Sequence, residues 1–373
     1  MKKLFTAAII AAFLQITFSG FVRAQLTSLP SGGNKRASVY EQIGLTDVTI
    51  VYSRPGVKGR EGHIWGELVP VGYVDQGFGT SKAAPWRAGA NESTTIQFSN
   101  DVKIEGQTLP AGKYGFFVAY DPNECTLIFS KNSSSWGSFY YKPDEDVLRV
   151  KVKPQAADKS VERLKYEFTD QTNESAVVQL QWEKLVIPFK VEADPVNTQV
   201  EYFRRELRSQ KGFNWEAWNQ AAQYCAQNKV NLDQALLWAD TAVSVNFGGD
   251  QSFIAWSTKA MVLNSLGREA EAMSVMKTAL PYGSEIELYQ YGKVLAIGKK
   301  GKEALDIFKI NYDKHPNDFF SNFGMTRGYS AIGDYKKAIV YAQKADAQAP
   351  NKPNKDVVEK AIKTLQDGKD FNL

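Results

Sequence analysis

Two kinds of hydrophobic pattern divide the chain. Between residues 37 and 194, apolar side chains alternate with polar ones in short runs, which Gly, Pro, Asn and Asp separate. A period of two gives each run one apolar face, as in a β-strand with one buried side. From residue 195 onward, apolar positions recur every three or four residues, which predicts amphipathic helices. We therefore expect an all-β domain over residues 37–194, followed by an all-α region.

The alternating runs predict strands near residues 48–52, 94–99, 114–120, 126–130, 147–153, 163–168, 176–182 and 185–191. Glu105 and Gly106 between two short runs match a two-residue hairpin turn. No helix-length amphipathic segment interrupts the series, so a parallel β-α-β architecture is not expected. Many short strands at regular spacing favour an antiparallel sandwich or barrel.

The helical half begins with Asp194 and Pro195, which would end the last strand and start a linker helix over residues 195–213. Repeats are expected over residues 214–350, followed by a capping helix and tail over residues 351–373. The clearest repeat copy shows Tyr, Gly, Ala and Pro in a fixed order, at Tyr329, Gly333, Asp334, Tyr335, Ala338, Ala342, Ala345 and Pro350.

The copy before it carries matching residues one period earlier. Ala304 precedes Ala338, and Pro316 precedes Pro350, by the same interval of 34 residues. Residues 214–350 thus resemble the tetratricopeptide repeat family. The resemblance implies a right-handed α-solenoid whose concave face binds a protein or peptide. The alternative is that the repeats only stabilise one another or dock on the β domain, since repeats must stack to bury a core.

The amino terminus has the pattern of a signal peptide. Lys2 and Lys3 precede an apolar run that ends at Phe18, and a cleavage-site pattern follows with Ser19, Gly20 and the stretch Val22, Arg23, Ala24, Gln25. This predicts export with cleavage after Ala24 and a periplasmic or secreted protein. No Cys that could carry a lipid lies nearby. An uncleaved anchor is the alternative, but the apolar run is shorter than the roughly 20 residues of a membrane span. We therefore expect no membrane-spanning segment after the signal peptide is cleaved.

Composition narrows the classes of partner. The formal net charge of +4 comes from 45 basic and 41 acidic residues, which is too balanced to attract nucleic acid. With two His and two Cys, a Cys/His zinc cluster is nearly excluded. We expect no cofactor, no metal and no nucleic-acid partner. Cys125 and Cys225 lie in a strand-like and a helix-like run, and we expect two separate buried thiols.

Candidate chemistry lies in two polar loops of the β domain. The ligand-binding residues that we predict are Ser53, Arg54, Lys58 and Arg60 in the first loop, and Trp86, Arg87, Asn91 and Glu92 in the second. Guanidinium groups and exposed backbone N–H groups in such loops could hold a carboxylate, sulfate or phosphate. The ligand would be a small anion or a glycan.

Two other interpretations of these loops stay open. An ion pair between Arg87 or Arg54 and Glu92 could pin the loops to the sheets. Glu92 or Glu67 could instead act with His63 in acid/base chemistry, as in a secreted hydrolase. No nucleophile stands at motif spacing from a base, so we assign no catalytic residue.

A longer string of residues around these loops has its own resemblance. It includes Ser53, Arg54, Pro55, Lys58, Gly59, Arg60, Trp65, Gly66, Pro70, Trp86, Arg87, Gly89, Ala90, Asn91, Glu92, Leu109, Pro110, Ala111, Gly112, Trp136 and Gly137. Residues 37–191 are similar to the exported bacterial family called domain of unknown function 2911. This resemblance implies an exported all-β domain, often followed by repeat helices, with no assigned activity. Residues 77–82 look like an insertion relative to the family pattern. The sequence thus predicts an exported, non-catalytic binding and scaffold protein.

Overall fold

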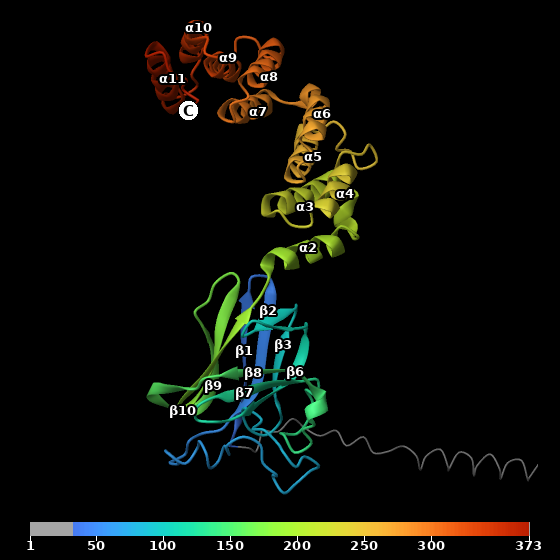
Figure 1. The fold of residues 1–373 in the computed structure, drawn as a ribbon, viewed down its shortest axis with the longest axis vertical. Coiled ribbons are helices and arrows are strands. Elements are labelled where there is room, and N and C mark those ends of the chain that lie inside the picture. Colours follow the sequence, from blue (N-terminus) through green and yellow to red (C-terminus); the bar gives the residue numbers. More distant parts are fainter. Residues whose placement is uncertain (1–32, 373) are drawn as a thin grey trace, which may run out of the picture. The chain divides into compact units, whose positions relative to one another are not determined.

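The computed structural model describes residues 33–372 and divides the chain into two compact units, one ending at Ala193 and the other beginning at Asp194 (Figure 1). The predicted signal peptide, residues 1–24, lies outside the described residues. Each unit has a single type of secondary structure. The first contains strands with one short 3-10 helix, η1 (Pro143–Glu145), and the second contains helices.

The first unit consists of two antiparallel sheets. The six-stranded sheet has the order β1 (Lys35–Ile43), β2 (Thr46–Arg54), β3 (Thr94–Phe98), β6 (Gly112–Ala119), β7 (Cys125–Ser130) and β8 (Asp146–Val152). The four-stranded sheet has the order β5 (Gln107–Leu109), β4 (Val102–Ile104), β10 (Ser175–Glu192) and β9 (Gln155–Thr169). The antiparallel all-β prediction is confirmed.

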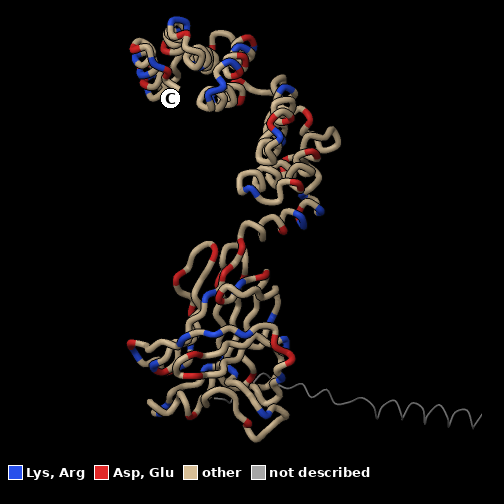
Figure 2. Tube along the Cα trace, viewed as in Figure 1, with Lys and Arg blue, Asp and Glu red and all other residues tan. Residues whose placement is uncertain are grey.

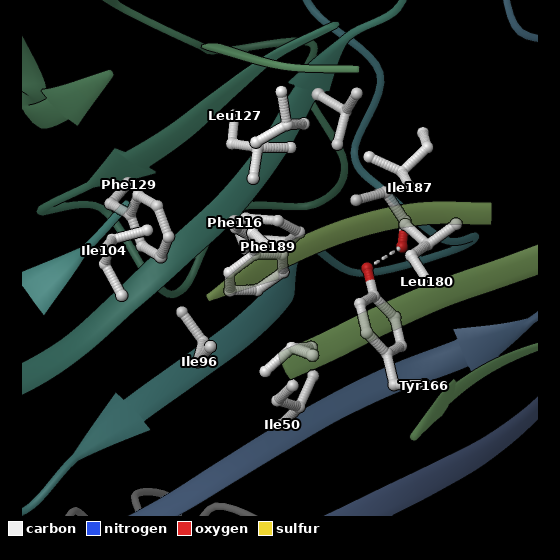
Figure 3. Packing of buried hydrophobic residues seen from close by; sticks show 14 of the residues in the cluster. Ile50, Ile96, Ile104, Phe116, Leu127, Phe129, Tyr166, Leu180, Ile187 and Phe189 are labelled. Carbon is white, nitrogen blue, oxygen red and sulfur yellow. Dashed lines mark hydrogen bonds between the residues drawn. The ribbon is translucent and has the colours of Figure 1, made fainter. Parts of the chain in front are cut away.

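The core of this unit lies between the two sheets. Along β2, the alternate residues Val48, Ile50 and Tyr52 are buried, which is the face that the sequence pattern predicts. The ring of Phe116 on β6 lies 5.5 Å from that of Phe189 on β10, so side chains of the two sheets interdigitate (Figure 3). This packing is that of a sandwich.

Local turn chemistry agrees with the sequence between β4 and β5. Glu105 has φ of 48° and Gly106 has φ of 78°, so both central residues of this hairpin are left-handed. Positive φ at both positions is the requirement of a type I′ turn. The predicted hairpin turn is confirmed.

Two elements differ from the prediction. β1 was not among the expected strands, because it lies at a sheet edge and most of its side chains are exposed or half-buried. The two strands expected at residues 176–182 and 185–191 are one strand, β10. A bulge at Glu183, with φ of 51°, shifts the register there and interrupts the alternation without ending the strand.

The second unit is built from helices. In chain order they are α2 (Pro195–Glu206), η2 (Gln210–Phe213), α3 (Trp215–Asn228), α4 (Leu232–Ala242), α5 (Phe253–Ser265), α6 (Glu269–Ala279), η3 (Leu280–Tyr282), α7 (Glu285–Ile297), α8 (Gly301–Lys314), α9 (Phe319–Ala331), α10 (Tyr335–Ala347) and α11 (Lys352–Gln366). The Asp194 side chain accepts from Asn197 N and Pro195 follows it, so α2 begins as the sequence predicts. The capping helix predicted within residues 351–373 is α11.

Small residues let the paired helices approach one another. A Cβ atom on Gly292 of α7 would lie 2.6 Å from Phe308 of α8, and one on Gly324 of α9 would lie 2.5 Å from the same ring. Ala304 and Ala338, one 34-residue period apart, are fully buried at equivalent places in α8 and α10. Successive helix pairs therefore form repeats of the tetratricopeptide type.

Three further features of the sequence can be compared with the structure: the cysteines, membrane-spanning segments and the distribution of charge. Cys125 and Cys225 are both free and buried, as expected, and they belong to different units. Within residues 33–372, no helix has the length and apolar character that crossing a membrane would require. Basic and acidic residues are interspersed over both units (Figure 2).

Candidate functional site

The long irregular segment that joins β2 to β3 lies at one end of the sheets (Figure 1). Residues of this segment line a pocket of about 590 Å³. This segment, residues 55–93, is held against β6 by paired backbone hydrogen bonds between Trp86 and Val118, of 2.9 and 2.8 Å. Both predicted loops contribute to the pocket. The predicted site residues that line it are Lys58, Arg60, Trp86, Arg87 and Asn91.

The other three predicted residues lie elsewhere. Ser53 and Glu92 line a separate pocket of about 170 Å³, where the Ser53 hydroxyl donates to the Glu92 carboxylate at 3.3 Å. The Nε of Arg54 donates to the carbonyl oxygen of Leu164 at 2.8 Å, which fastens β2 to β9. The structure therefore divides the predicted set between two pockets and one structural contact.

Arg87 has the most unusual surroundings in the larger pocket. Its Nη1 donates to the Asn91 carbonyl oxygen at 2.8 Å, and its guanidinium lies 4.8 Å from the centre of the Phe139 ring. Gly137 covers the guanidinium so closely that a Cβ there would lie 2.3 Å from it. Burial lowers the pKa of Arg87.

Among the residues that the structure describes, no carboxylate forms an ion pair with this cation. Within residues 33–372, no ion pair joins Arg87 or Arg54 to Glu92, so the expected structural salt bridge is absent there. A partly buried guanidinium without an acidic partner carries a desolvation cost, which an anion in the pocket would offset.

The backbone that carries Arg87 is strained and held in place. Ala88 has φ of 49° and Asn91 has φ of 60°, a region that costs non-glycine residues about 1 kcal/mol or more each. The Ala88 carbonyl oxygen accepts hydrogen bonds from Tyr166 Oη at 2.8 Å and from Thr94 Oγ1 at 3.0 Å. Buried hydroxyls from two strands thus fix the loop conformation.

Aromatic rings form one wall of the pocket. Trp86 and Trp182 are stacked, with ring centroids 6.1 Å apart and an interplanar angle of 17°. The Nε1–H of Trp86 donates to the Gly89 carbonyl oxygen at 3.1 Å. The Nε1–H of Trp182 is buried and has no hydrogen-bond partner among the described residues. An unsatisfied buried donor is costly, so this indole is a second group that could bind an anion.

Trp182 is not among the site residues that the sequence pattern predicts. It lies in the middle of β10, about ninety residues along the chain from the loop of Arg87, and an aromatic residue in a strand ordinarily belongs to the core. Only the fold shows that this residue lines the pocket.

The basic residues of the first loop stand at the rim. Backbone carbonyl oxygens of the same loop hold the Arg60 guanidinium in place. Its Nε donates to Val57 O at 2.9 Å and its Nη2 donates to Gly56 O at 2.7 Å. Lys58 is exposed, with its backbone N–H donating to Glu162 Oε1 at 3.2 Å. Arg60 still has free donor capacity, because a guanidinium has five N–H groups and these two bonds use only two nitrogens.

The structure brings together only one pair of the acid/base alternative, His63 with Glu67, and leaves Glu92 apart. His63 Nδ1 lies 3.0 Å from Glu67 Oε1, and both side chains are largely exposed. Glu67 lines the larger pocket, whereas Glu92 lines the smaller one. Among the described residues, Glu67 is the only side chain that hydrogen-bonds His63. Residues 33–372 also contain no cluster of His, Cys, Asp and Glu that could hold a metal ion.

Solved structures with similar elements are helical-repeat proteins. MamA residues 41–end from Desulfovibrio magneticus RS-1 shares 18% identity with a TM-score of 0.29, covering 43% of this chain and 92% of that one. YrrB, described as a TPR protein with an unusual peptide-binding site, shares 18% identity with a TM-score of 0.30, covering 47% of this chain and 88% of that one. No curated protein matches the chain.

The first unit has a family match of its own. Residues 34–191 match the family model described as protein of unknown function (DUF2911), which spans both sheets and both polar loops. The resemblance seen in the sequence is confirmed. The β-sandwich unit thus matches the DUF2911 family model over residues 34–191, and a unit of helical repeats follows it.

Proposed function

We propose that this protein is an exported, non-catalytic binding and scaffold protein. The β-sandwich unit holds a small anionic ligand in the pocket of Arg87, and the helical unit holds a protein or peptide. The observation that carries the proposal is the partly buried Arg87 guanidinium, which lines a pocket and lacks an acidic partner among the described residues.

The lining of the pocket supports a ligand class. Arg87, Arg60 and Lys58 supply positive charge, Glu67 supplies one carboxylate, and the largely buried Trp86 and Trp182 supply apolar surface. Guanidinium groups pair well with carboxylate, sulfate or phosphate, and indole rings stack on apolar faces of rings. An acidic sugar combines an anionic group with an apolar ring face, so this class fits the lining best.

Exposed apolar side chains support a protein-binding role for the helical unit. Ile254 and Met261 on α5, and Ile286, Val294 and Ile297 on α7, are large hydrophobic residues that remain exposed. These exposed hydrophobic side chains on the repeats are our candidates for contact with a protein partner. Export rests on the amino-terminal pattern of Lys2, Lys3 and the apolar run before Ala24.

The hydrolase alternative has less support. His63 and Glu67 pair with each other on the exposed surface, and Glu92 lines a different pocket. A general acid and base need to reach the same substrate bond. We therefore favour binding over catalysis.

A thermal-shift screen of the purified protein with uronic acids, sulfated sugars, sugar phosphates and inorganic anions tests the ligand site. A ligand at about 100 times its Kd stabilises the folded state by about 2.7 kcal/mol, which moves the unfolding midpoint of a unit this size by roughly 5–10 °C. We expect this shift to disappear in Arg87→Gln.

Arg54→Gln is the matched control, because Arg54 contacts Leu164 O and does not line the pocket. Its ligand-induced shift should equal that of the unsubstituted protein. A ligand that stabilises Arg87→Gln as much as the unsubstituted protein would overturn the site assignment.

A further inference from the structure

The segment that follows α11 folds back onto the helical unit. Gly368, with φ of 72°, reverses the chain just after Gln366. The Phe371 ring then stacks on Phe323 of α9, with centroids 5.7 Å apart and an angle of 27°. The Arg327 guanidinium lies 4.9 Å from the centre of the Phe371 ring. The segment is therefore anchored by an aromatic residue between a ring and a cation.

Polar contacts continue on both sides of this anchor. Asn372 accepts from Arg327 Nη1 through its Oδ1 at 2.9 Å and donates from its Nδ2 to the Arg327 carbonyl oxygen at 3.0 Å. Ser330 Oγ donates to Asp370 Oδ1 at 2.6 Å and accepts from Phe371 N at 3.2 Å. Three successive residues, an acid, an aromatic and an amide, are each bound by specific groups of α9.

Arg327 is the centre of this surface. It lies in the middle of α9, is 9% exposed, and its Nε donates to Tyr289 Oη of α7 at 3.0 Å. Its guanidinium also lies 5.1 Å from the centre of the Phe323 ring. No ion pair neutralises it among the described residues, and the Asn372 amide satisfies one of its N–H groups.

The repeats have a cap without this segment. α11 packs on the last repeat through its own apolar side chains, including the buried Val358, Ala361 and Leu365. A terminal helix of this kind covers the end of a repeat array. The contacts of residues 370–372 on α9 are therefore additional to capping and resemble recognition of an extended peptide, while Tyr289 of α7 holds Arg327 in place.

We propose that Tyr289, Phe323, Arg327 and Ser330 form a peptide-binding site, which residues 370–372 occupy as an intramolecular ligand. The partner is a protein segment with the same order of acidic, aromatic and amide side chains, and it must displace residues 370–372 to bind. This deepens the protein-binding part of the proposed function and does not depend on the anion pocket of the β-sandwich unit.

Intramolecular occupancy has a predictable effect on affinity. A segment tethered by a few residues has an effective concentration of about millimolar or higher. A separate peptide binds only molecules whose site is free. Its apparent Kd therefore equals the intrinsic Kd divided by the fraction of molecules with a free site. Removing the side chains of Phe371 and Asn372 should therefore strengthen binding of an added peptide at least tenfold.

The test uses a fluorescent peptide of residues 368–373, GKDFNL, titrated into the full chain and followed by anisotropy. We expect the double variant Phe371→Ala/Asn372→Ala to bind it at least tenfold more tightly than the unsubstituted chain. A peptide with Ala in place of Phe and Asn should not bind the double variant. Val357→Ala, an exposed position on α11, is the matched control and should leave the weak binding unchanged.

Equal binding of GKDFNL to the double variant and the unsubstituted chain would overturn the proposal, as would equal binding of the Ala-substituted peptide. So would loss of helical circular dichroism in the double variant, because the segment would then be part of the fold. None of these outcomes bears on the anion pocket, and capture of a protein that depends on Ile286 and Val294 would still support the broader protein-binding role.

Discussion

The hydroxyl of Tyr166 donates a 2.8 Å hydrogen bond to the carbonyl oxygen of Ala88, the residue next to Arg87. Tyr166 lies on β9 of the four-stranded sheet and is buried, whereas Ala88 lies in the segment that joins two strands of the other sheet. The bond appears as the dashed line at Tyr166 in Figure 3. The sandwich core thus holds the strained loop that presents Arg87 to the pocket.

Tyr166→Phe should therefore weaken both stability and ligand binding. Loss of one buried hydrogen bond costs about 1 kcal/mol, which lowers the unfolding midpoint of a unit of this size by roughly 2–4 °C. Thermal unfolding followed by tryptophan fluorescence measures the change. Tyr40→Phe is the control, because its hydroxyl bonds Asp47 on the exposed surface. Equal effects of the two substitutions would contradict the role of the Tyr166 bond.

Gly137→Ala should displace Arg87. The new Cβ would lie 2.3 Å from the guanidinium, so the side chain has to move, at a packing cost of about 1–3 kcal/mol. Gly59→Ala is matched in backbone strain, since φ is 63° at Gly137 and 71° at Gly59, but nothing lies within 4 Å of a Cβ on Gly59. Denaturant unfolding of both variants measures the difference. The site model fails if Gly137→Ala retains full ligand stabilisation.

Glu285 should make the helical unit less stable as pH rises toward neutrality. Burial, together with the nearby Asp318 carboxylate, raises the pKa of Glu285 to about 7. The folded state therefore binds this proton more tightly than the unfolded state, and the resulting stabilisation is complete below pH 4.5 and lost as pH rises through about 7. Glu285→Gln should remove this component.

The measurement is urea unfolding at several pH values, followed by the helical circular dichroism signal. Titrating groups far from Glu285 cancel in the difference between the unsubstituted chain and Glu285→Gln, so the difference reports the Glu285–Asp318 pair. The difference should grow between pH 4.5 and 7. A difference that is constant with pH would show that Glu285 does not hold a proton in this way.

Both cysteines should resist modification in the folded protein. Burial raises the pKa of Cys125 to about 11 and also raises the pKa of Cys225, so little thiolate forms near neutral pH. We expect no reaction with a thiol reagent at pH 8 until denaturant is added, after which two groups should react. Rapid labelling of the native chain would contradict the burial of these thiols, and a reductant should leave the unfolding midpoint unchanged.

Local pattern predicts the faces of strands and helices but not which distant residues meet. The alternation of Val48, Ile50 and Tyr52 correctly gave their buried face, because one side of β2 packs on the core. It could not predict that Trp182 would line the pocket beside Arg87, since that contact depends on the pairing and packing of two sheets. Register and topology are set by long-range contacts, which period-two patterning does not encode.

The predicted site shows the same limit. The sequence places Arg54 and Arg60 in one polar stretch and does not distinguish them, yet Arg54 bonds Leu164 O while Arg60 lines the pocket. The two differ because β2 extends to Arg54, so its side chain is committed to β9 before the loop begins. The residue types predicted which side chains could bind an anion. The position at which β2 ends determines which of the two arginines lines the pocket.

The most direct test of the ligand site is the indole Nε1–H resonance of Trp182 in a nitrogen-15 NMR titration with the anion that stabilises the protein. Trp182→Phe assigns the resonance. The Trp182 signal should shift the most among the eight tryptophans, and it should stay unchanged in Arg87→Gln. Larger shifts at tryptophans of the helical unit, such as Trp218 and Trp256, or an unchanged Trp182 signal at saturating ligand, would contradict the proposed site.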